Sequence, residues 1–194
     1  MSNRDKILAA AEDLLATQGV GGLSVRTIAA AAGTSTIGIY SHFQGKPGVL
    51  EALYVRGFER IEQAMSPAEG EADARARLLG MLGRYLAVAQ EHKAQYWLIF
   101  GESGPGFAPS SESREPGRRG FRNLAEAARQ AIGPGATSEQ GASLAMRIWA
   151  LAHGFVSLEH HVISREEPVE VWTRQVMSAV ESMLDDVAEN GWRG

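Results

Sequence analysis

Hydroxyl, imidazole and ammonium groups are concentrated between Thr34 and Lys46, where the sequence reads Thr-Ser-Thr-Ile-Gly-Ile-Tyr-Ser-His-Phe-Gln-Gly-Lys. These side chains donate and accept hydrogen bonds, which suits them to recognise a polar partner. The sequence shows no paired carboxylates in a suitable frame, no glycine-rich phosphate loop and no nucleophile elbow. The chemistry that this run predicts is therefore binding, and we predict no catalytic residue.

Two short helices around one sharp turn must position these polar groups. Ser24 is suited to cap the first helix, and Gly33 to end it, because glycine adopts the left-handed conformation at little cost. Ser35 is suited to cap the second helix, whose Ile39 and Phe43 repeat at i, i+4 and point inward. The pattern predicts a helix-turn-helix whose second helix enters the major groove of DNA.

The rest of the chain also has helical periodicity, and no alternating strand pattern of useful length is present. We predict a first helix over about residues 4–17, with Gly19 as its stop signal, and a fourth helix that begins near Pro47. Further helices are predicted near residues 72–90, 96–100, 121–132, 138–163 and 168–187, with a long loop over residues 101–120. The predicted fold is all-α: a three-helix N-terminal head joined by a fourth helix to a helical body.

Composition limits the possible functions further. The 194 residues include no cysteine, which excludes disulfides, thiolate metal sites and cysteine nucleophiles. The net charge is −4, but residues 1–48 carry +1, so the first helices are the better candidates to face phosphate, through few contacts. No apolar run approaches the ~20 residues of a membrane span, and the N-terminus lacks an apolar signal core. We therefore expect a cytoplasmic protein with no membrane partner.

The N-terminal part of the chain resembles the TetR family of bacterial transcriptional regulators. The residues that carry the resemblance are Ile7-Leu8-Ala9-Ala10-Ala11, Gly19, Leu23 to Ala29, Ala32-Gly33-Thr34-Ser35, Gly38 to Phe43, and Lys46. In the body, Trp149-Ala-Leu-Ala-His153-Gly154 resembles a Trp-His-Gly signature of one C-terminal subfamily. The resemblance implies a repressor, the family's default, that binds a palindromic operator in double-stranded DNA as a homodimer. A small-molecule effector would swing the connecting helix, separate the recognition helices and release the DNA.

The resemblance also implies domains and DNA-contacting residues. It places a helix-turn-helix DNA-binding domain at residues 1–47, the connecting helix at 48–66, and a ligand-binding and dimerisation domain at 67–194. The predicted DNA-binding residues are Arg26, Thr27, Thr34, Ser35, Thr36, Gly38, Tyr40, His42 and Lys46. Of these, Thr34, Ser35, Thr36 and Gly38 would face base edges, whereas Tyr40, His42 and Lys46 would hold phosphates. Alternatively, Ser35 is only a cap, Tyr40 only part of the core, and His42 only a solvated group.

The body offers aromatic and methionine side chains that could line an apolar cavity. The predicted ligand-binding residues are Tyr85, Trp97, Phe100, Phe107, Phe121, Met146, Trp149 and His153. Aromatic and methionine side chains at helical spacing also form an ordinary hydrophobic core. Both interpretations, a ligand cavity and a core, stay open. The histidines at 153, 160 and 161 lie near Glu159, but the Glu-x-x-His spacing of di-iron bundles is absent, so we predict no metal and no cofactor.

The two C-terminal helices are amphipathic, and the resemblance makes them the contact between subunits of a homodimer. Trp172 and Val176, with Leu151, Phe155 and Leu158, could form this seam or face their own core. Two other functions compete with DNA binding. One is a helical adaptor for a protein partner, which an isoelectric point of 5.8 suits better. The other is an enzyme that acts on the ligand of the pocket.

Overall fold

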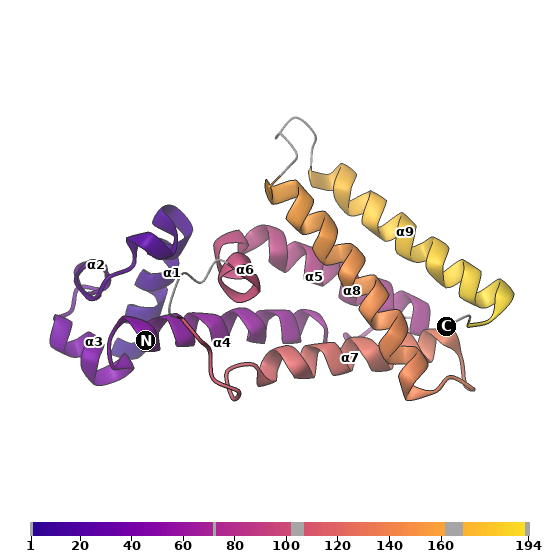
Figure 1. Cartoon of the computed structure of the whole chain (residues 1–194), viewed down its shortest axis with the longest axis horizontal. Coiled ribbons are helices and arrows are strands. Elements are labelled where there is room, and N and C mark those ends of the chain that lie inside the picture. Colours follow the sequence, from indigo (N-terminus) through magenta and orange to yellow (C-terminus); the bar gives the residue numbers. More distant parts are fainter. Residues whose placement is uncertain (1, 72, 102–106, 162–168, 193–194) are drawn as a thin grey trace. The chain divides into compact units, whose positions relative to one another are not determined.

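The computed structural model describes residues 2–71, 73–101, 107–161 and 169–192, and all regular structure in these ranges is helical (Figure 1). This part of the chain comprises α1 (Asn3–Gly22), α2 (Val25–Ala31), α3 (Thr36–Phe43), α4 (Lys46–Ala64), α5 (Ala74–Glu91), α6 (Lys93–Phe100), α7 (Glu115–Ile132), α8 (Ser138–His161) and α9 (Val169–Asn190). No helix within it has the length and apolar character needed to cross a membrane. The all-α fold with an N-terminal helix-turn-helix is confirmed.

Contacts between residues divide the chain into two compact units. Unit 1 comprises residues 1–60 and 90–117, and unit 2 comprises residues 61–89 and 118–194. Each boundary falls inside a helix, so α4, α5 and α7 pass from one unit to the other. The predicted domain boundaries after residues 47 and 66 divide the chain by function and remain a prediction, whereas the two units reflect packing alone.

Serine side chains begin the first three helices. Ser2, Ser24 and Ser35 each accept a hydrogen bond of 3.1 Å from the backbone N–H three residues ahead. These bonds satisfy N–H groups that have no partner inside the helix. Gly19 interrupts α1 with φ 65° and ψ −173°, after which helical turns continue to Gly22. The predicted stop signal is thus a kink, and the helix ends later than residue 17.

The core of unit 1 is formed by the first four helices and completed by α6. Its buried side chains are Ile7, Leu8, Ala11, Leu15, Leu23, Ile28, Ala29, Ile39, Phe43, Val49, Leu50, Leu53 and Leu98. Leu98 belongs to α6, which packs against α1 although some eighty residues separate them along the chain. The helix-turn-helix therefore shares its core with a segment from the middle of the sequence.

A polar network in unit 1 joins α1, α4 and α6. The carboxylate of Glu12 on α1 accepts hydrogen bonds from Arg60 at 2.9 Å and from Arg56 at 3.3 Å. The amide of Gln95 on α6 donates to the Leu53 carbonyl at 2.8 Å and to Glu12 at 3.3 Å, and it accepts from Arg60. Gln95 is 5% exposed, so these bonds satisfy a buried polar group that would otherwise be costly.

The segment before α7 is more ordered than the predicted loop over residues 101–120. The buried Ser113 donates its hydroxyl to the Glu51 carboxylate on α4 at 2.6 Å. The loop prediction is wrong in its last part, because α7 begins at Glu115. Residues 104–106, the Gly-Pro-Gly of that prediction, lie outside the described residues.

Unit 2 takes its core from α5, α7, α8 and α9. The buried side chains include Leu78, Met81, Leu82, Tyr85, Leu124, Ala128, Leu144, Ala145, Ile148, Val176 and Val180. α8 and α9 pack against each other, and the rings of Phe155 and Trp172 lie 6.0 Å apart. Gly141 allows α8 to approach α7 closely, because a Cβ there would lie 2.6 Å from the Ala125 carbonyl oxygen.

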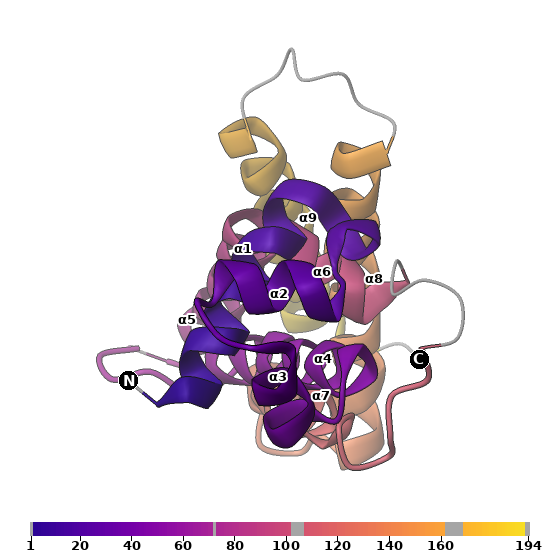
Figure 2. The same ribbon diagram turned by 90° about the vertical axis from the view of Figure 1, so that its left-hand side faces the viewer.

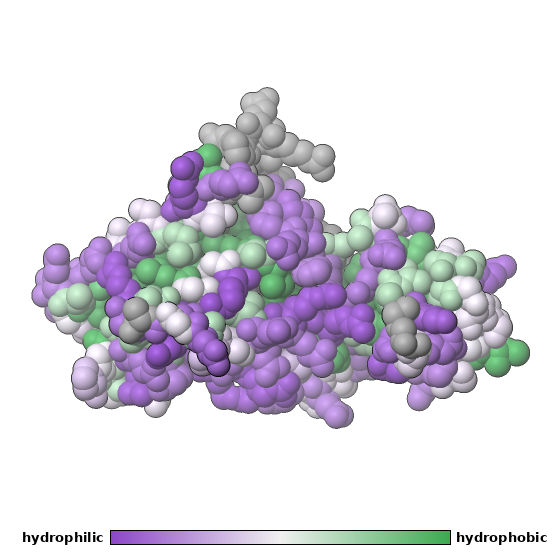
Figure 3. Space-filling model, turned by 180° about the vertical axis from the view of Figure 1, so that it is seen from behind, coloured by the Kyte–Doolittle hydropathy of each residue, from purple (hydrophilic) through white to green (hydrophobic). Residues whose placement is uncertain are grey.

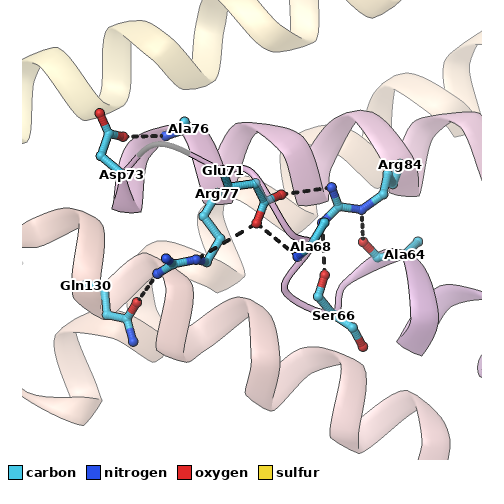
Figure 4. Close-up of polar contacts among 9 residues, drawn as sticks. All are labelled: Ala64, Ser66, Ala68, Glu71, Asp73, Ala76, Arg77, Arg84 and Gln130. Carbon is cyan, nitrogen blue, oxygen red and sulfur yellow. Dashed lines mark hydrogen bonds and ion pairs between the residues drawn. The ribbon is translucent and has the colours of Figure 1, made fainter.

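Arg84 on α5 ties down the C-terminal end of α4. Its guanidinium donates to the carbonyl oxygens of Ala64 and Ser66 at 2.9 Å each, and to the Glu71 carboxylate at 2.9 Å (Figure 4). The Ala64 carbonyl is one of the last acceptors of α4, which have no partner inside the helix, and the Ser66 carbonyl follows two residues later. A cation at this end of the helix also suits the helix dipole. Arg77 extends the cluster, since it pairs with Glu71 at 3.9 Å and donates to an amide on α7.

We expect Arg84→Met to lower the free energy of unfolding by about 1–2 kcal/mol, because three charge-assisted hydrogen bonds lose their donor. Arg75→Met on the same helix is the matched control, since Arg75 pairs with Asp185 on an exposed surface. Exposed pairs of that kind contribute less than about 1 kcal/mol. Urea denaturation of the two variants checks this, and equal losses would contradict the role given to Arg84.

The polar network around Glu12 predicts a dependence of stability on pH. Partial burial raises the pKa of the Glu12 carboxyl, but the hydrogen bond and charge of Arg60, with those of Arg56, outweigh burial and lower the pKa overall. Ionised Glu12 therefore stabilises the folded chain at pH values above its unfolded pKa of about 4.3. This contribution is lost as the pH falls through the lower pKa of the folded state.

Glu12→Gln should accordingly cost about 1–2 kcal/mol at pH 7 and should flatten the fall in stability between about pH 5 and pH 3. Urea denaturation at a series of pH values measures both effects. Asp13→Asn, at the exposed neighbouring position, serves as control and should keep the slope of the unaltered chain. A Glu12→Gln profile parallel to that of the unaltered chain would refute the assignment.

Candidate nucleic-acid interface

The turn between α2 and α3 is set by its backbone. Gly33 has φ 62°, a left-handed backbone conformation that residues other than glycine rarely adopt. This confirms the role predicted for Gly33 at the end of the first helix of the motif. The N–H of Thr34 donates back to the Ala29 carbonyl at 3.0 Å, which closes the end of α2. Ser35 then caps α3, so only a short turn separates the two helices (Figure 2).

The rotation of α3 about its own axis decides what it can present to a partner. Ile39 is fully buried and Phe43 is 5% exposed, and both belong to the core of unit 1. On the outward side, Ile37 is 78% exposed and Tyr40 is 58% exposed. The outer face of α3 is therefore open to solvent along its length.

The structure places residues 34–38 at the N-terminal end of α3. Ser35 and Thr36 are exposed, whereas Thr34 is half-buried. A Cβ at Gly38 would lie 2.7 Å from the Thr34 hydroxyl oxygen, so the absence of a side chain at position 38 gives that hydroxyl its place. Hydroxyl groups of this kind can donate to or accept from either base edge.

The three predicted phosphate-binding side chains lie toward the end of α3 and the start of α4. The Tyr40 ring lies beside the turn, since a Cβ at Gly45 would be 3.2 Å from it. His42 is exposed, and its Nε2 lies 3.3 Å from the amide nitrogen of Asn3 on α1. Lys46 donates to the Val20 carbonyl at 3.2 Å and holds the end of α1. Two further donors of that ammonium group remain for a phosphate.

The two predicted DNA-binding residues on α2 differ in their surroundings. Arg26 is exposed. Thr27 belongs to a capping box, because its hydroxyl oxygen accepts from the Ser24 N–H at 2.9 Å while its backbone N–H donates to the Ser24 hydroxyl. The Thr27 hydroxyl thus also helps to cap the N-terminal end of α2, a structural role that was not predicted for it.

Two features of this surface differ from the prediction. The predicted outer face of α3 consists of polar residues, and Ile37 has no role in it. The signal was available, because Ile37 precedes the inward-facing Ile39 by two residues, which is about 200° of helical rotation. The prediction also left out α1, whose Arg4 lies over the Phe43 ring at 5.0 Å and whose Asn3 meets His42. Nothing in the local pattern of α1 indicated these contacts.

The predicted ligand-binding residues fall into both units. Trp97, Phe100 and Phe107 belong to unit 1, whereas Tyr85, Phe121, Met146, Trp149 and His153 belong to unit 2. In unit 2, the Trp149 indole N–H donates to the Tyr85 hydroxyl at 3.2 Å. The Trp149 ring lies 6.1 Å from Phe121 and 6.2 Å from His153, whose pKa is lowered by burial. Met146 is 47% exposed, so its side chain does not line a buried site.

Within the described part of the chain, two cavities lie in unit 1, and their linings contain none of the predicted ligand-binding residues. A groove of about 570 Å³ lies between α1, the end of α3 and α4 as far as Glu59, and its lining includes Arg4, His42 and Arg56. A second hollow of about 440 Å³ lies between α1 and the start of α6. Side chains that could bind a metal form no group of three or more among the described residues. The side chain of His161, one of the histidines considered, lies outside them.

Comparison with known proteins adds independent observations. The model of the tetR family of bacterial regulatory proteins matches residues 7–53, which include α2, the turn and α3. The model of a tetracyclin repressor-like C-terminal domain matches residues 78–187, more than half of the chain. The Trp-His-Gly subfamily remains a prediction.

Similar proteins agree with these models. The HTH-type transcriptional repressor DrrR1 of Streptomyces coeruleorubidus is 30% identical over 113 residues, which cover 55% of this chain and 38% of that relative. A protein of unknown function from Rhodococcus sp. RHA1 is 30% identical, with a TM-score of 0.78 and 95% of each chain covered. A TetR variant from Acinetobacter baumannii AYE in complex with minocycline has a TM-score of 0.63 at 18% identity, covering 96% and 97% of the chains.

The two family models together span both the helix-turn-helix and most of the remaining helices. Members of this family regulate transcription, bind DNA operators and small molecules, and form dimers. The chain belongs to the TetR family of bacterial transcriptional regulators.

Proposed function

We propose that this chain is a repressor that binds a palindromic operator as a homodimer and leaves it when a small molecule binds to its body. The observation that carries the proposal is the orientation of α3, which buries Ile39 and Phe43 and exposes Thr36 and Tyr40. An exposed recognition helix can lie in the major groove, with base edges next to its N-terminal residues.

In this proposal α3 supplies both kinds of contact. Thr36 reads a base edge from the first turn, and Gly38 lets the backbone approach the groove. Tyr40, His42 and Lys46 then hold phosphates beside the α3–α4 turn, and Arg26 with Thr27 reaches the backbone from α2. The charge of +1 over residues 1–48 implies few phosphate contacts and a modest dependence of affinity on salt.

The dimer and the effector are inferred from unit 2 and from the relatives. α8 and α9 form a packed pair, and Leu158 on α8 is 47% exposed, which suits a surface that a second copy covers. Two-fold pairing would place two copies of α3 in half-sites about 34–36 Å apart. DrrR1 is named as a repressor, and the Acinetobacter structure holds minocycline, which supports repression and a small-molecule effector.

The proposal makes the chain a binding protein rather than an enzyme. It also places the chain in the cytoplasm, because a chromosomal operator lies there. The adaptor hypothesis has the two C-terminal helices bind a protein partner and gives α3 no duplex to read, so DNA binding separates the two hypotheses.

Selection from random duplexes with the purified chain identifies the operator, and a gel-shift titration then measures the affinity of variants. We expect Tyr40→Ala to weaken binding at least tenfold, because each of the two subunits loses a phosphate contact worth about 1 kcal/mol. Gln130→Ala, at an exposed position on α7, which is neither the recognition helix nor a proposed dimer helix, is the control and should bind as the unaltered chain does.

Sizing chromatography of each variant confirms that the assembly is intact. Failure of the selection to enrich any duplex would overturn the proposal in favour of the adaptor. Turnover of a compound by the purified chain would favour the enzyme.

A further inference from the structure

Ile37 is the most exposed large hydrophobic side chain among the described residues, at 78%. It lies in the first turn of α3, and Figure 3 shows apolar surface at the end of unit 1 that carries this helix. Inside the free chain this side chain does not pack, and isoleucine does not favour a helix over alanine. Its apolar surface is therefore available to a partner.

The neighbouring residues on α3 do not cover the branched side chain of Ile37. Gly38 has no side chain, and Ser41, one turn further on, donates its hydroxyl back to the Gly38 carbonyl at 3.0 Å. Ile39 and Phe43 point to the opposite side of the helix, into the core. The centre of the outer face thus consists of an aliphatic group beside the half-exposed Tyr40 ring.

The chemistry of α3 limits how it can distinguish base pairs. Residues 36–43 include no arginine, lysine, asparagine or glutamine, the side chains that form bidentate bonds with guanine or adenine. A hydroxyl group both donates and accepts, so Thr36 by itself discriminates weakly between base pairs. The major-groove edge of DNA presents one apolar group, the C5 methyl of thymine.

We propose that Ile37 reads a thymine methyl group in each half-site of the operator. This inference rests on the proposed function, because it requires α3 to lie in the major groove. The surface of α3 that carries Ile37 lies in the region matched by the tetR family model. The contact would therefore belong to the interface that the family uses. Ile37 is then a specificity-determining residue, and burial of its side chain against the methyl group explains its exposure in the free chain.

Deletion of the methyl group tests the contact directly. After the operator has been selected, each thymine is replaced in turn by deoxyuridine, which removes the C5 methyl and leaves every hydrogen-bonding group in place. We expect one symmetric pair of replacements to weaken binding of the unaltered chain about five- to twentyfold, the effect of losing one buried methyl contact in each half-site. Replacements at other thymines should change affinity less than twofold.

The variant Ile37→Ala completes a double-mutant cycle. It should bind the thymine operator about five- to twentyfold more weakly, and should bind the deoxyuridine operator as weakly as the unaltered chain does. Folding should be intact, because the side chain is exposed. Ile132→Ala, at the end of α7 in unit 2, is the control with the same change of side chain and should bind both operators normally.

The outcomes separate this inference from the proposed function. A selected operator that tolerates deoxyuridine at every position, or additive losses in the cycle, would overturn the role of Ile37 and leave the repressor proposal standing. The same holds if Ile37→Ala changes the oligomeric state without DNA, since a second copy would then cover Ile37. Selection of no duplex would overturn both.

Discussion

Burial of Ile39 and Phe43 in the core of unit 1 is the constraint on which the proposed DNA surface depends. A helix packed by two side chains at i, i+4 has a single rotation about its axis, so these two residues decide which others face outward. The backbone turn at Gly33 and the Ser35 cap decide where the helix starts. Together they present an open first turn with hydroxyl groups, a glycine and one aliphatic side chain.

The helix-turn-helix does not stand alone in this structure. Leu98 of α6 completes its core, and Gln95 of α6 joins Glu12 of α1 to Arg60 of α4. Both arginines of that network are on α4, the helix that continues into unit 2. Within unit 1, a change in the position of α6 or of the first part of α4 would therefore alter the hydrogen bonds of α1.

Unit 2 anchors the other end of α4 by different means. Arg84 donates to the last carbonyl of α4 and to the Ser66 carbonyl just after it, and it is itself paired with Glu71, so the helix end is bonded to α5. Among the aromatic side chains of this unit, Tyr85 is buried in the core, and its hydroxyl accepts a hydrogen bond from the indole N–H of the partly buried Trp149. A ligand that entered between them would have to replace that bond.

Local chemistry by itself determined the helix-turn-helix. Serine caps, glycine turns and i, i+4 apolar pairs act over a few residues, so Ser24, Gly33, Ser35 and Phe43 could be assigned from the sequence, and the family motif lies in the same stretch. Long-range packing decided the rest. The position of α6 beside α1 and the network around Gln95 depend on residues far apart in the chain. No local pattern encodes such contacts, because they exist only once the helices have packed.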